Sequence, residues 1–137
     1  MLKTNIWPQV ENLIKRHEAL KMKWLQLNEQ DIHDWLDVCD EMNDLIIELE
    51  SMYLEEDEAL DKDKNLRFLE LKDQTTEDWK KINTDATAKA KADIELYDRR
   101  VDQIYIKETI KRLEKKSKVI EHYQNIWKFY MRKDFSI

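Results

Sequence analysis

The sequence contains no glycine and only one proline, Pro8, among its 137 residues. Glycine most easily adopts the left-handed backbone of tight turns, and proline interrupts a helix more strongly than any other residue. Because both are nearly absent, the chain has few ways to reverse direction or to end a helix. The sequence therefore predicts an all-α protein built from long helices.

The missing glycine also excludes whole classes of enzyme. P-loops and dinucleotide-binding folds need glycine so that backbone amides can approach a phosphate. The one cysteine, Cys39, lies between Asp37, Asp40 and Glu41, whose charges disfavour a reactive thiolate, and it cannot form an intrachain disulfide. We therefore expect a non-enzymatic protein of a reducing compartment, the cytoplasm.

Long apolar runs are absent as well. No stretch approaches the roughly 18 apolar residues that cross a membrane, and the first twenty residues lack the apolar segment of a signal peptide. We expect a soluble, unprocessed protein with no membrane partner. Glu29, His33 and Asp37 share one helix face, but the Glu-x-x-His pair of di-metal bundles is missing at all three histidines. We therefore expect no metal, no cofactor and no small-molecule substrate.

Charge is abundant and unevenly distributed. Residues 29–63 contain fifteen acids and a single lysine, whereas residues 99–137 contain eleven basic residues and five acids. The overall net charge of −6 conceals this separation. Blocks of like charge are often solvated faces, and they also pair with neighbouring subunits or recognise a charged partner.

Apolar spacing and capping residues predict four helices in one domain, residues 1–137, at about 8–27, 29–56, 64–73 and 84–131. Pro8 suits a first helical turn, and Asn28 and Thr84 suit N-caps. The sequence DKDKN at residues 61–65 favours a connection between about 57 and 64. The last helix would extend on the order of 70 Å, which predicts an elongated bundle or coiled coil.

Two apolar seams follow helical spacing. The first alternates steps of three and four over more than three heptads, as coiled coils do: Ile32, Trp35, Cys39, Met42, Ile46, Leu49 and Tyr53. The second, in the last helix, runs through Ala86, Ala88, Ala90 and Ala92, then Ile94, Tyr97, Val101 and Ile104, and after a change of phase through Ile106, Ile110, Leu113, Ser117, Ile120 and Trp127. We expect a homo-oligomer or a helical protein partner to bury such seams. The alternative is a monomeric three- or four-helix bundle.

Basic and aromatic residues interleave in the last helix. The candidate nucleic-acid-binding residues are Lys107, Lys111, Arg112, Lys115, Lys116, Lys118, Trp127 and Lys128, with Tyr123 among them. Single-stranded nucleic acid is bound by cations that contact phosphates and by rings that stack on bases. A lysine-rich outer face that only confers solubility is the competing interpretation.

Residues 84–130, TDATAKAKADIELYDRRVDQIYIKETIKRLEKKSKVIEHYQNIWKFY, resemble the C-terminal halves of phage-type helical recombination mediators, the UvsY-like family. In both, an alanine-rich helix start leads into a long helix with a late basic segment and an aromatic end. The resemblance implies a ring-forming helical oligomer that binds single-stranded DNA and helps to load a recombinase while single-strand-binding protein is displaced.

Three functions remain open from the sequence. The first is a phage DNA recombination or replication accessory that contacts single-stranded DNA and a protein partner. The second is an acidic inhibitor or adaptor that mimics DNA, for example an anti-defence protein, and binds a basic groove on a host protein. Its candidate residues are Asp34, Asp37, Asp40, Glu41, Asp44 and Glu48. The third is a structural coiled-coil scaffold.

Overall fold

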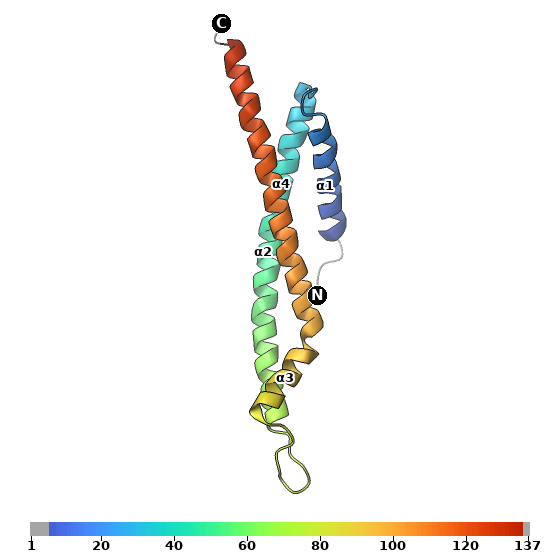
Figure 1. The fold of residues 1–137 in the computed structure, drawn as a ribbon, viewed down its shortest axis with the longest axis vertical. Coiled ribbons are helices and arrows are strands. Elements are labelled where there is room, and N and C mark those ends of the chain that lie inside the picture. The colour runs from blue at the N-terminus through green and yellow to red at the C-terminus, as the bar shows by residue number, and fades with distance from the viewer. Residues whose placement is uncertain (1–5, 136–137) are drawn as a thin grey trace. The chain divides into compact units, whose positions relative to one another are not determined.

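Four helices make up most of the chain (Figure 1). The computed structural model describes residues 6–135, with side chains up to residue 129. The helices are α1 (Ile6–Met22), α2 (Glu29–Lys72), α3 (Asp85–Glu95) and α4 (Tyr97–Phe135). Apart from one isolated bridge, between Thr75 and Lys81, the described residues contain no β-structure. The predicted all-α fold with a long C-terminal helix is confirmed.

Internal contacts divide the chain into two compact units. Unit 1 contains the residues up to Glu50 and those from Glu108 onward, and unit 2 contains Ser51–Lys107. Three helical segments build unit 1, from α1, α2 and α4. Unit 2 is a hairpin whose arms come from α2 on one side and from α3 and α4 on the other. A single domain stays a prediction.

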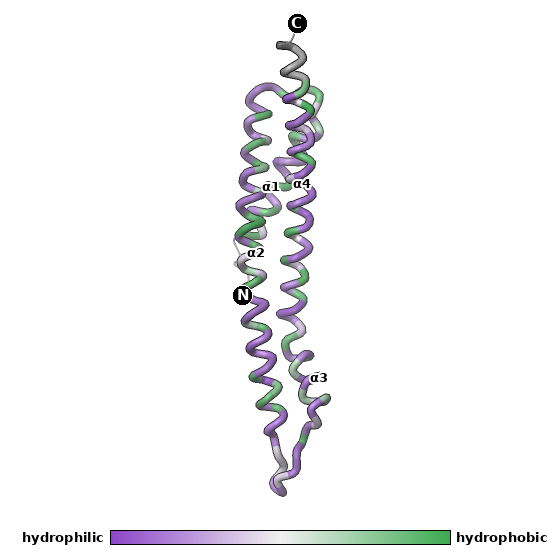
Figure 2. Tube along the Cα trace, turned by 90° about the vertical axis from the view of Figure 1, so that its left-hand side faces the viewer, coloured by the Kyte–Doolittle hydropathy of each residue, from purple (hydrophilic) through white to green (hydrophobic). Residues whose placement is uncertain are grey.

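The predicted α2 seam forms much of the core of unit 1. Trp35, Cys39, Met42, Ile46 and Leu49 are buried, and Ile32 is half-buried, as is Tyr53 in unit 2. Hydrophobic and hydrophilic residues follow one another in short bands along α2 and α4 (Figure 2). The other helices of unit 1 complete this core with Ile6, Val10, Leu13, Ile14 and His17 from α1 and Ile110, Leu113, Ser117 and Ile120 from α4.

The turn between α1 and α2 is closed by the predicted cap. Asn28 accepts a hydrogen bond through Oδ1 from the backbone N–H of Asp31 at 2.8 Å, and Asp31 accepts one from the N–H of Asn28 at 3.3 Å. This reciprocal pair satisfies two amides at the start of α2. The predicted first helix is too long, however. α1 ends at Met22, and residues 23–26 form a turn through short-range bonds such as that from Lys23 N–H to the Leu20 carbonyl, 3.1 Å.

The predicted connection between about 57 and 64 is wrong, because α2 continues unbroken to Lys72. Leu60 is 1% exposed and keeps the helix packed through this stretch. Asp63 and Lys64 favour a turn by their composition, but they form ion pairs with Arg99 and Asp93 across the hairpin of unit 2. Charged residues with good partners and adequate helix propensity do not end a helix.

The predicted single helix over 84–131 is interrupted once. Thr84 caps α3 as expected, because its hydroxyl accepts a hydrogen bond from the N–H of Thr87 at 3.2 Å. At Leu96 the backbone leaves the helical region (φ −99°, ψ 8°), and α4 begins at Tyr97. The Leu96 N–H still bonds to the Ala92 carbonyl, so the interruption is confined to one residue.

The second predicted seam holds only in part. Ala88, Ala92, Ile106, Ile110, Leu113, Ser117 and Ile120 are buried, but Ala86, Ala90, Ile94, Tyr97, Val101 and Ile104 are exposed. In unit 2 the side of α4 that faces α2 carries Arg99 and Gln103, which bond to acidic side chains of α2. In unit 2, these polar contacts therefore determine which side of α4 packs against α2, and the apolar residues Tyr97, Val101 and Ile104 remain exposed.

The break predicted between about 73 and 84 is present as a compact hairpin-like loop. The N–H of Trp79 bonds to the Thr76 carbonyl at 2.9 Å, and the N–H of Thr76 bonds to the Lys80 carbonyl at 2.8 Å. Within residues 6–135, Trp79 is the one residue with a positive φ, 62°. Because the chain has no glycine, a bulky residue occupies the left-handed position of this turn.

Truncation of the α2 seam tests this core. Leu49 is fully buried, so Leu49→Ala is expected to lower the free energy of unfolding by about 2–5 kcal/mol, because apolar burial is removed and a cavity is left behind. Ile47 lies two residues away and is 65% exposed, so Ile47→Ala is expected to change it by less than about 0.5 kcal/mol. Urea denaturation followed by circular dichroism measures both. Equal losses would contradict the assignment of the buried face.

Candidate functional site

The predicted basic residues of α4 lie mostly on its outer side. Within unit 1 they are Lys111, Arg112, Lys115 and Lys118, which are exposed and which we call the basic face. Among the described residues, one ion pair involves this face, and it joins Lys111 to Glu108 on the same helix at 4.0 Å. The basic face is therefore not neutralised by the acidic helix within the described chain. Lys128 of unit 1 and Lys107 of unit 2 are exposed too.

Lys116 differs from its neighbours, because it stabilises the packing of α1. Its Nζ donates to Glu18 Oε1 at 2.7 Å, and its side chain is 21% exposed. The hydrogen bond from Lys116 is the main reason that the pKa of Glu18 lies below its usual value. Lys116 thus links α4 to α1 and is less available to an external ligand than the basic face.

The aromatic residues expected beside the basic residues are partly used for packing. Tyr123 contacts Trp35 with ring centroids 5.0 Å apart and Trp24 with centroids 5.4 Å apart. Trp127 is half-buried. Rings held in such contacts present little surface for stacking on a base. The basic face therefore offers cations without a continuous row of available rings.

A buried histidine extends this aromatic cluster. The indole N–H of Trp35 donates to Nδ1 of His17 at 3.1 Å, and His17 is 1% exposed. Burial, followed by the nearby charge of Lys116, lowers the pKa of His17 below 6.5. A protonated imidazole could not accept the Trp35 bond at Nδ1, since both of its nitrogens carry protons. His17 therefore stays neutral in the folded protein at neutral pH.

The predicted acidic residues lie along the outer side of α2 in unit 1. Asp37, Asp40, Glu41, Asp44 and Glu48 are exposed, and Asp34 is half-buried. We call these six the acidic face. Glu41 pairs with Arg16 of α1 at 2.6 Å, and Asp34 accepts a hydrogen bond from Gln30 at 3.0 Å. The other four make no ion pair within the described chain, so most of this charge is open to solvent.

Three acids of this face border a groove between α1 and α2. The groove has a volume of about 580 Å³ and is lined by Pro8, Gln9, Asn12, Leu13, Arg16, Glu41, Asp44, Leu45 and Glu48. Its floor is apolar at the two leucines, and its α2 wall is acidic. Such a groove combines apolar contact with negative charge.

The α2 seam, proposed as an oligomer interface, packs inside the chain instead of lying on the surface of unit 1. Cys39 is buried with its Sγ 3.4 Å from Ser117 Oγ, and Ser117 donates to Asn43 Oδ1 at 2.9 Å. The thiol therefore belongs to a small polar contact between α2 and α4. An oligomer stays a prediction, but side chains that are buried inside unit 1 cannot contact another copy of the chain.

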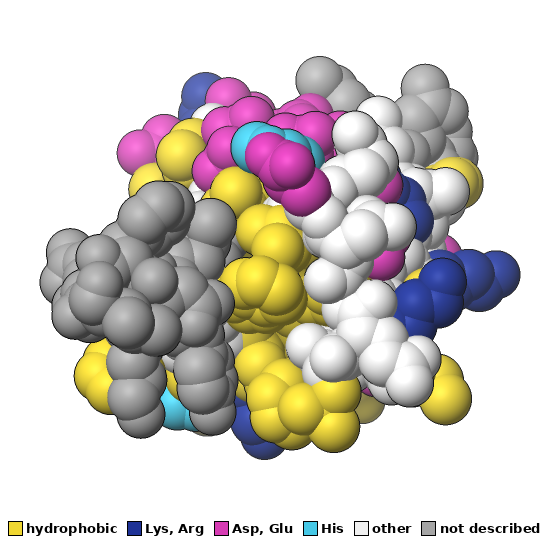
Figure 3. Space-filling model, turned by 90° about the horizontal axis from the view of Figure 1, so that it is seen from above, with side chains coloured by type: hydrophobic (Ala, Val, Ile, Leu, Met, Phe, Trp, Pro, Cys, Tyr) yellow, Lys and Arg dark blue, Asp and Glu magenta, His cyan; other side chains and the backbone are white. Residues whose placement is uncertain are grey.

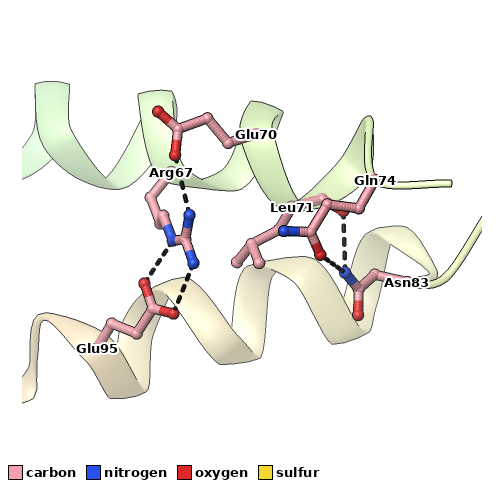
Figure 4. Close-up of polar contacts among 6 residues, drawn as sticks. All are labelled: Arg67, Glu70, Leu71, Gln74, Asn83 and Glu95. Carbon is pink, nitrogen blue, oxygen red and sulfur yellow. Dashed lines mark hydrogen bonds and ion pairs between the residues drawn. The ribbon is translucent and has the colours of Figure 1, made fainter.

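Unit 2 is held largely by polar contacts between its two arms. Arg67 of α2 donates to Glu95 of α3 through Nε at 2.6 Å and Nη2 at 3.1 Å (Figure 4). Arg99 bonds to Glu56 at 2.7 Å and Asp63 at 2.6 Å. The apolar core here is small and comprises Leu71, Ala88 and Ala92, with Phe68 packed against them. Of the acids in residues 51–63, Glu56 and Asp63 are thus paired with Arg99, and Asp57 accepts a hydrogen bond from Gln103, all within the hairpin.

Two surface features were not predicted from the sequence. One is the exposed stripe of Ile94, Tyr97, Val101 and Ile104 on α3 and α4. The other is Trp79, which is 86% exposed at the loop between α2 and α3. The polar sequence DQTTEDWKK around Trp79 indicates a break between helices. A tryptophan inside such a polar segment is the sequence feature from which its exposure could have been predicted.

The described residues contain no group of three or more His, Cys, Asp or Glu side chains arranged to hold a metal ion. None of the helices, as far as they are described, combines the length and apolar character that crossing a bilayer requires. Comparison of the chain with protein families, curated proteins and solved structures finds no match.

The His17–Trp35 contact predicts acid sensitivity. Because folding lowers the pKa of His17, the folded state binds fewer protons than the unfolded state below pH 6.5. Stability is therefore expected to fall as the pH drops from 6.5 through the folded-state pKa. His17→Gln, which does not titrate, should flatten the dependence of Tm on pH between about pH 7.5 and 5.

His33→Gln is the matched control, since it makes the same substitution at an exposed histidine of α2. This control is expected to keep the pH dependence of the wild type. Thermal denaturation of the three proteins at several pH values makes the comparison. If the wild type and His17→Gln lost stability in parallel over this range, the neutral buried imidazole would not be the source of the acid sensitivity.

Proposed function

We propose that this chain is a non-enzymatic binding protein that contacts single-stranded DNA through the basic face of α4, as a phage recombination or replication accessory would. The observation that carries the proposal is the exposure of Lys111, Arg112, Lys115 and Lys118, which form no ion pair with the acidic face of α2 within the described residues. The basic residues are thus open to an external anion.

The spacing of the basic face suits an extended phosphate backbone. Lys111, Lys115 and Lys118 follow one another at steps of four and three, so they share one side of α4. Their side chains point away from Leu113 and Ile120, which are fully buried. Lysine and arginine that neutralise phosphates release counterions, which makes binding strongly dependent on salt.

The packing of Tyr123 and the partial burial of Trp127 favour phosphate contacts over base stacking in this unit. Binding that depends on phosphates carries little sequence preference. We therefore expect similar affinities for oligonucleotides of different sequence, in agreement with an accessory protein that coats or remodels single strands.

The test is fluorescence anisotropy of a labelled single-stranded oligonucleotide titrated with protein at several salt concentrations. Replacing Lys111, Arg112, Lys115 and Lys118 with glutamine is expected to weaken binding at low salt. It should also reduce the slope of log K against log salt by about 0.7 for each phosphate that the variant no longer neutralises.

A matched control replaces four exposed lysines outside the basic face with glutamine: Lys15, Lys62, Lys80 and Lys89. It changes the net charge by the same amount and is expected to retain most of the slope. Absence of wild-type binding at low salt would refute the proposal. Equal weakening in both variants would show that only the net charge matters and would contradict the assignment to the basic face.

The groove beside the acidic face supports a second candidate, an adaptor or inhibitor that binds a basic helix of another protein. Asp44 and Glu48 provide negative charge beside the apolar Leu13 and Leu45, whereas Glu41 is already paired with Arg16. A partner with lysine or arginine beside an apolar stripe would complement both properties. In this second candidate the binding site is the α1–α2 groove and the ligand is a protein, whereas in the first the site is the basic face of α4 and the ligand is single-stranded DNA.

A labelled amphipathic peptide with lysines flanking a leucine stripe tests the second candidate. Replacement of Asp37, Asp44 and Glu48 with lysine is expected to weaken peptide binding by about tenfold or more, as loss of charge complementarity at an interface does. Reversal at Glu55, Glu58 and Asp61, which are exposed acids of unit 2, is the control with the same charge change. A peptide that bound both variants equally would contradict recognition by this groove.

A further inference from the structure

Trp79 occupies a backbone position that favours glycine. The bonds from Trp79 N–H to the Thr76 carbonyl and from Thr76 N–H to the Lys80 carbonyl define a three-residue hairpin loop that ends in a left-handed residue. Glycine or asparagine usually fills this place, because a Cβ atom is unfavourable there. A tryptophan therefore raises the free energy of the loop without any local benefit.

Burial within the chain does not offset this unfavourable conformation. The side chain of Trp79 is 86% exposed, and the described residues give its ring no aromatic or hydrogen-bonding contact. A large aromatic residue that is strained and exposed is typical of a contact made with something outside the chain, since Trp is enriched at the centres of interfaces.

The loop holds Trp79 in a defined position. The N–H of Ile82 bonds to the Gln74 carbonyl at 3.1 Å, beside the Thr75–Lys81 bridge. At the base, the side-chain amide of the buried Asn83 donates to the Leu71 carbonyl at 2.9 Å and to Gln74 Oε1 at 3.3 Å (Figure 4). A side chain held by such a loop loses little conformational entropy on binding.

Unit 1 carries an apolar hollow of a size that accepts an indole ring. It measures about 470 Å³ and is lined by Trp24, His122, Asn125, Ile126 and Phe129. Apolar side chains gather on the face of the molecule seen in Figure 3, with acidic side chains along one side and basic side chains at its edges. Three aromatic rings around a hollow favour an aromatic guest.

The charges beside the two features are complementary. Glu77 and Asp78 immediately precede Trp79, whereas exposed Lys23 and Lys128 adjoin residues that line the hollow. Lys80 and Lys81 follow Trp79 in the sequence, and Glu121 precedes His122, which lines the hollow. A ring inserted into the hollow would therefore bring groups of opposite charge near one another.

We propose that the surface around Trp79 is a self-association site, in which Trp79 of one copy inserts into the Trp24–Phe129 hollow of a second copy. The contact joins two different surfaces, so it is heterologous and each copy has one donor and one acceptor site. It does not depend on nucleic-acid binding, and it leaves the buried α2 seam undisturbed.

Trp79→Gly is the decisive variant, because it removes the ring and places the preferred residue in the left-handed position. Sedimentation velocity over a range of concentrations is expected to show association of the wild type. For Trp79→Gly we expect a dissociation constant larger by about 30-fold, as for truncation of an interface centre. Circular dichroism should show that the variant stays fully helical.

Ile94→Ala is the control, since Ile94 is 73% exposed in the same unit but belongs to the separate apolar stripe. It should associate as the wild type does. A wild type that remains monomeric at every soluble concentration would overturn the proposal. Association unchanged in Trp79→Gly and abolished in Ile94→Ala would also overturn it, and would assign self-association to the stripe.

A mixing experiment tests the heterologous geometry. Phe129→Ala removes a wall of the hollow but keeps Trp79, and Trp79→Gly keeps the hollow. At a concentration where each variant alone is monomeric, their mixture should form a one-to-one dimer through the single intact pair of sites. Failure of the mixture to associate would overturn the geometry. If Trp79→Gly instead weakened oligonucleotide binding with self-association unchanged, the ring would contact a base and the proposed pairing of copies would be wrong.

Discussion

Burial of the α2 seam is the constraint on which unit 1 depends. Trp35, Met42 and Leu49 are buried in the core of unit 1, and Trp35 contacts both His17 of α1 and Tyr123 of α4. The two oppositely charged surfaces of the unit therefore lie on helices whose apolar sides are packed inward. The same packing places Tyr123 inside the aromatic cluster. The packing of unit 1 therefore leaves the basic face exposed and leaves few exposed aromatic side chains beside it.

Unit 2 has a different balance of forces. Its two arms share a core of small residues, and their contact relies on Arg67 and Arg99 bonded to carboxylates. Exposed ion pairs contribute little stability individually, but a geometry with several bonds from each guanidinium specifies which side of a helix faces its neighbour. The apolar stripe through Ile94 and Ile104 is consequently left outside the hairpin.

The sequence was most informative where one periodic signal dominated. The α2 seam, the Asn28 cap and the Thr84 cap were predictable, because local spacing and capping chemistry determine them. The continuity of α2 past Asp63 and the exposure of Val101 were not, since both depend on ion pairs between residues far apart in the sequence, such as Asp63 and Arg99. The candidate surfaces were predictable as charge blocks. Only the tertiary structure showed that the basic face and the acidic face do not pair with each other within the described part of the chain and that Trp79 is exposed.

The polar contact between Cys39, Asn43 and Ser117 has a consequence for the alignment of α2 with α4. Two regular apolar stripes can slide past each other by one heptad at small cost, because each leucine or isoleucine finds an equivalent neighbour. A slide would separate Ser117 from the Asn43 amide and leave its hydroxyl against hydrocarbon. In a chain without glycine, these three side chains therefore favour one alignment of α2 with α4, together with the ring contact between Trp35 and Tyr123.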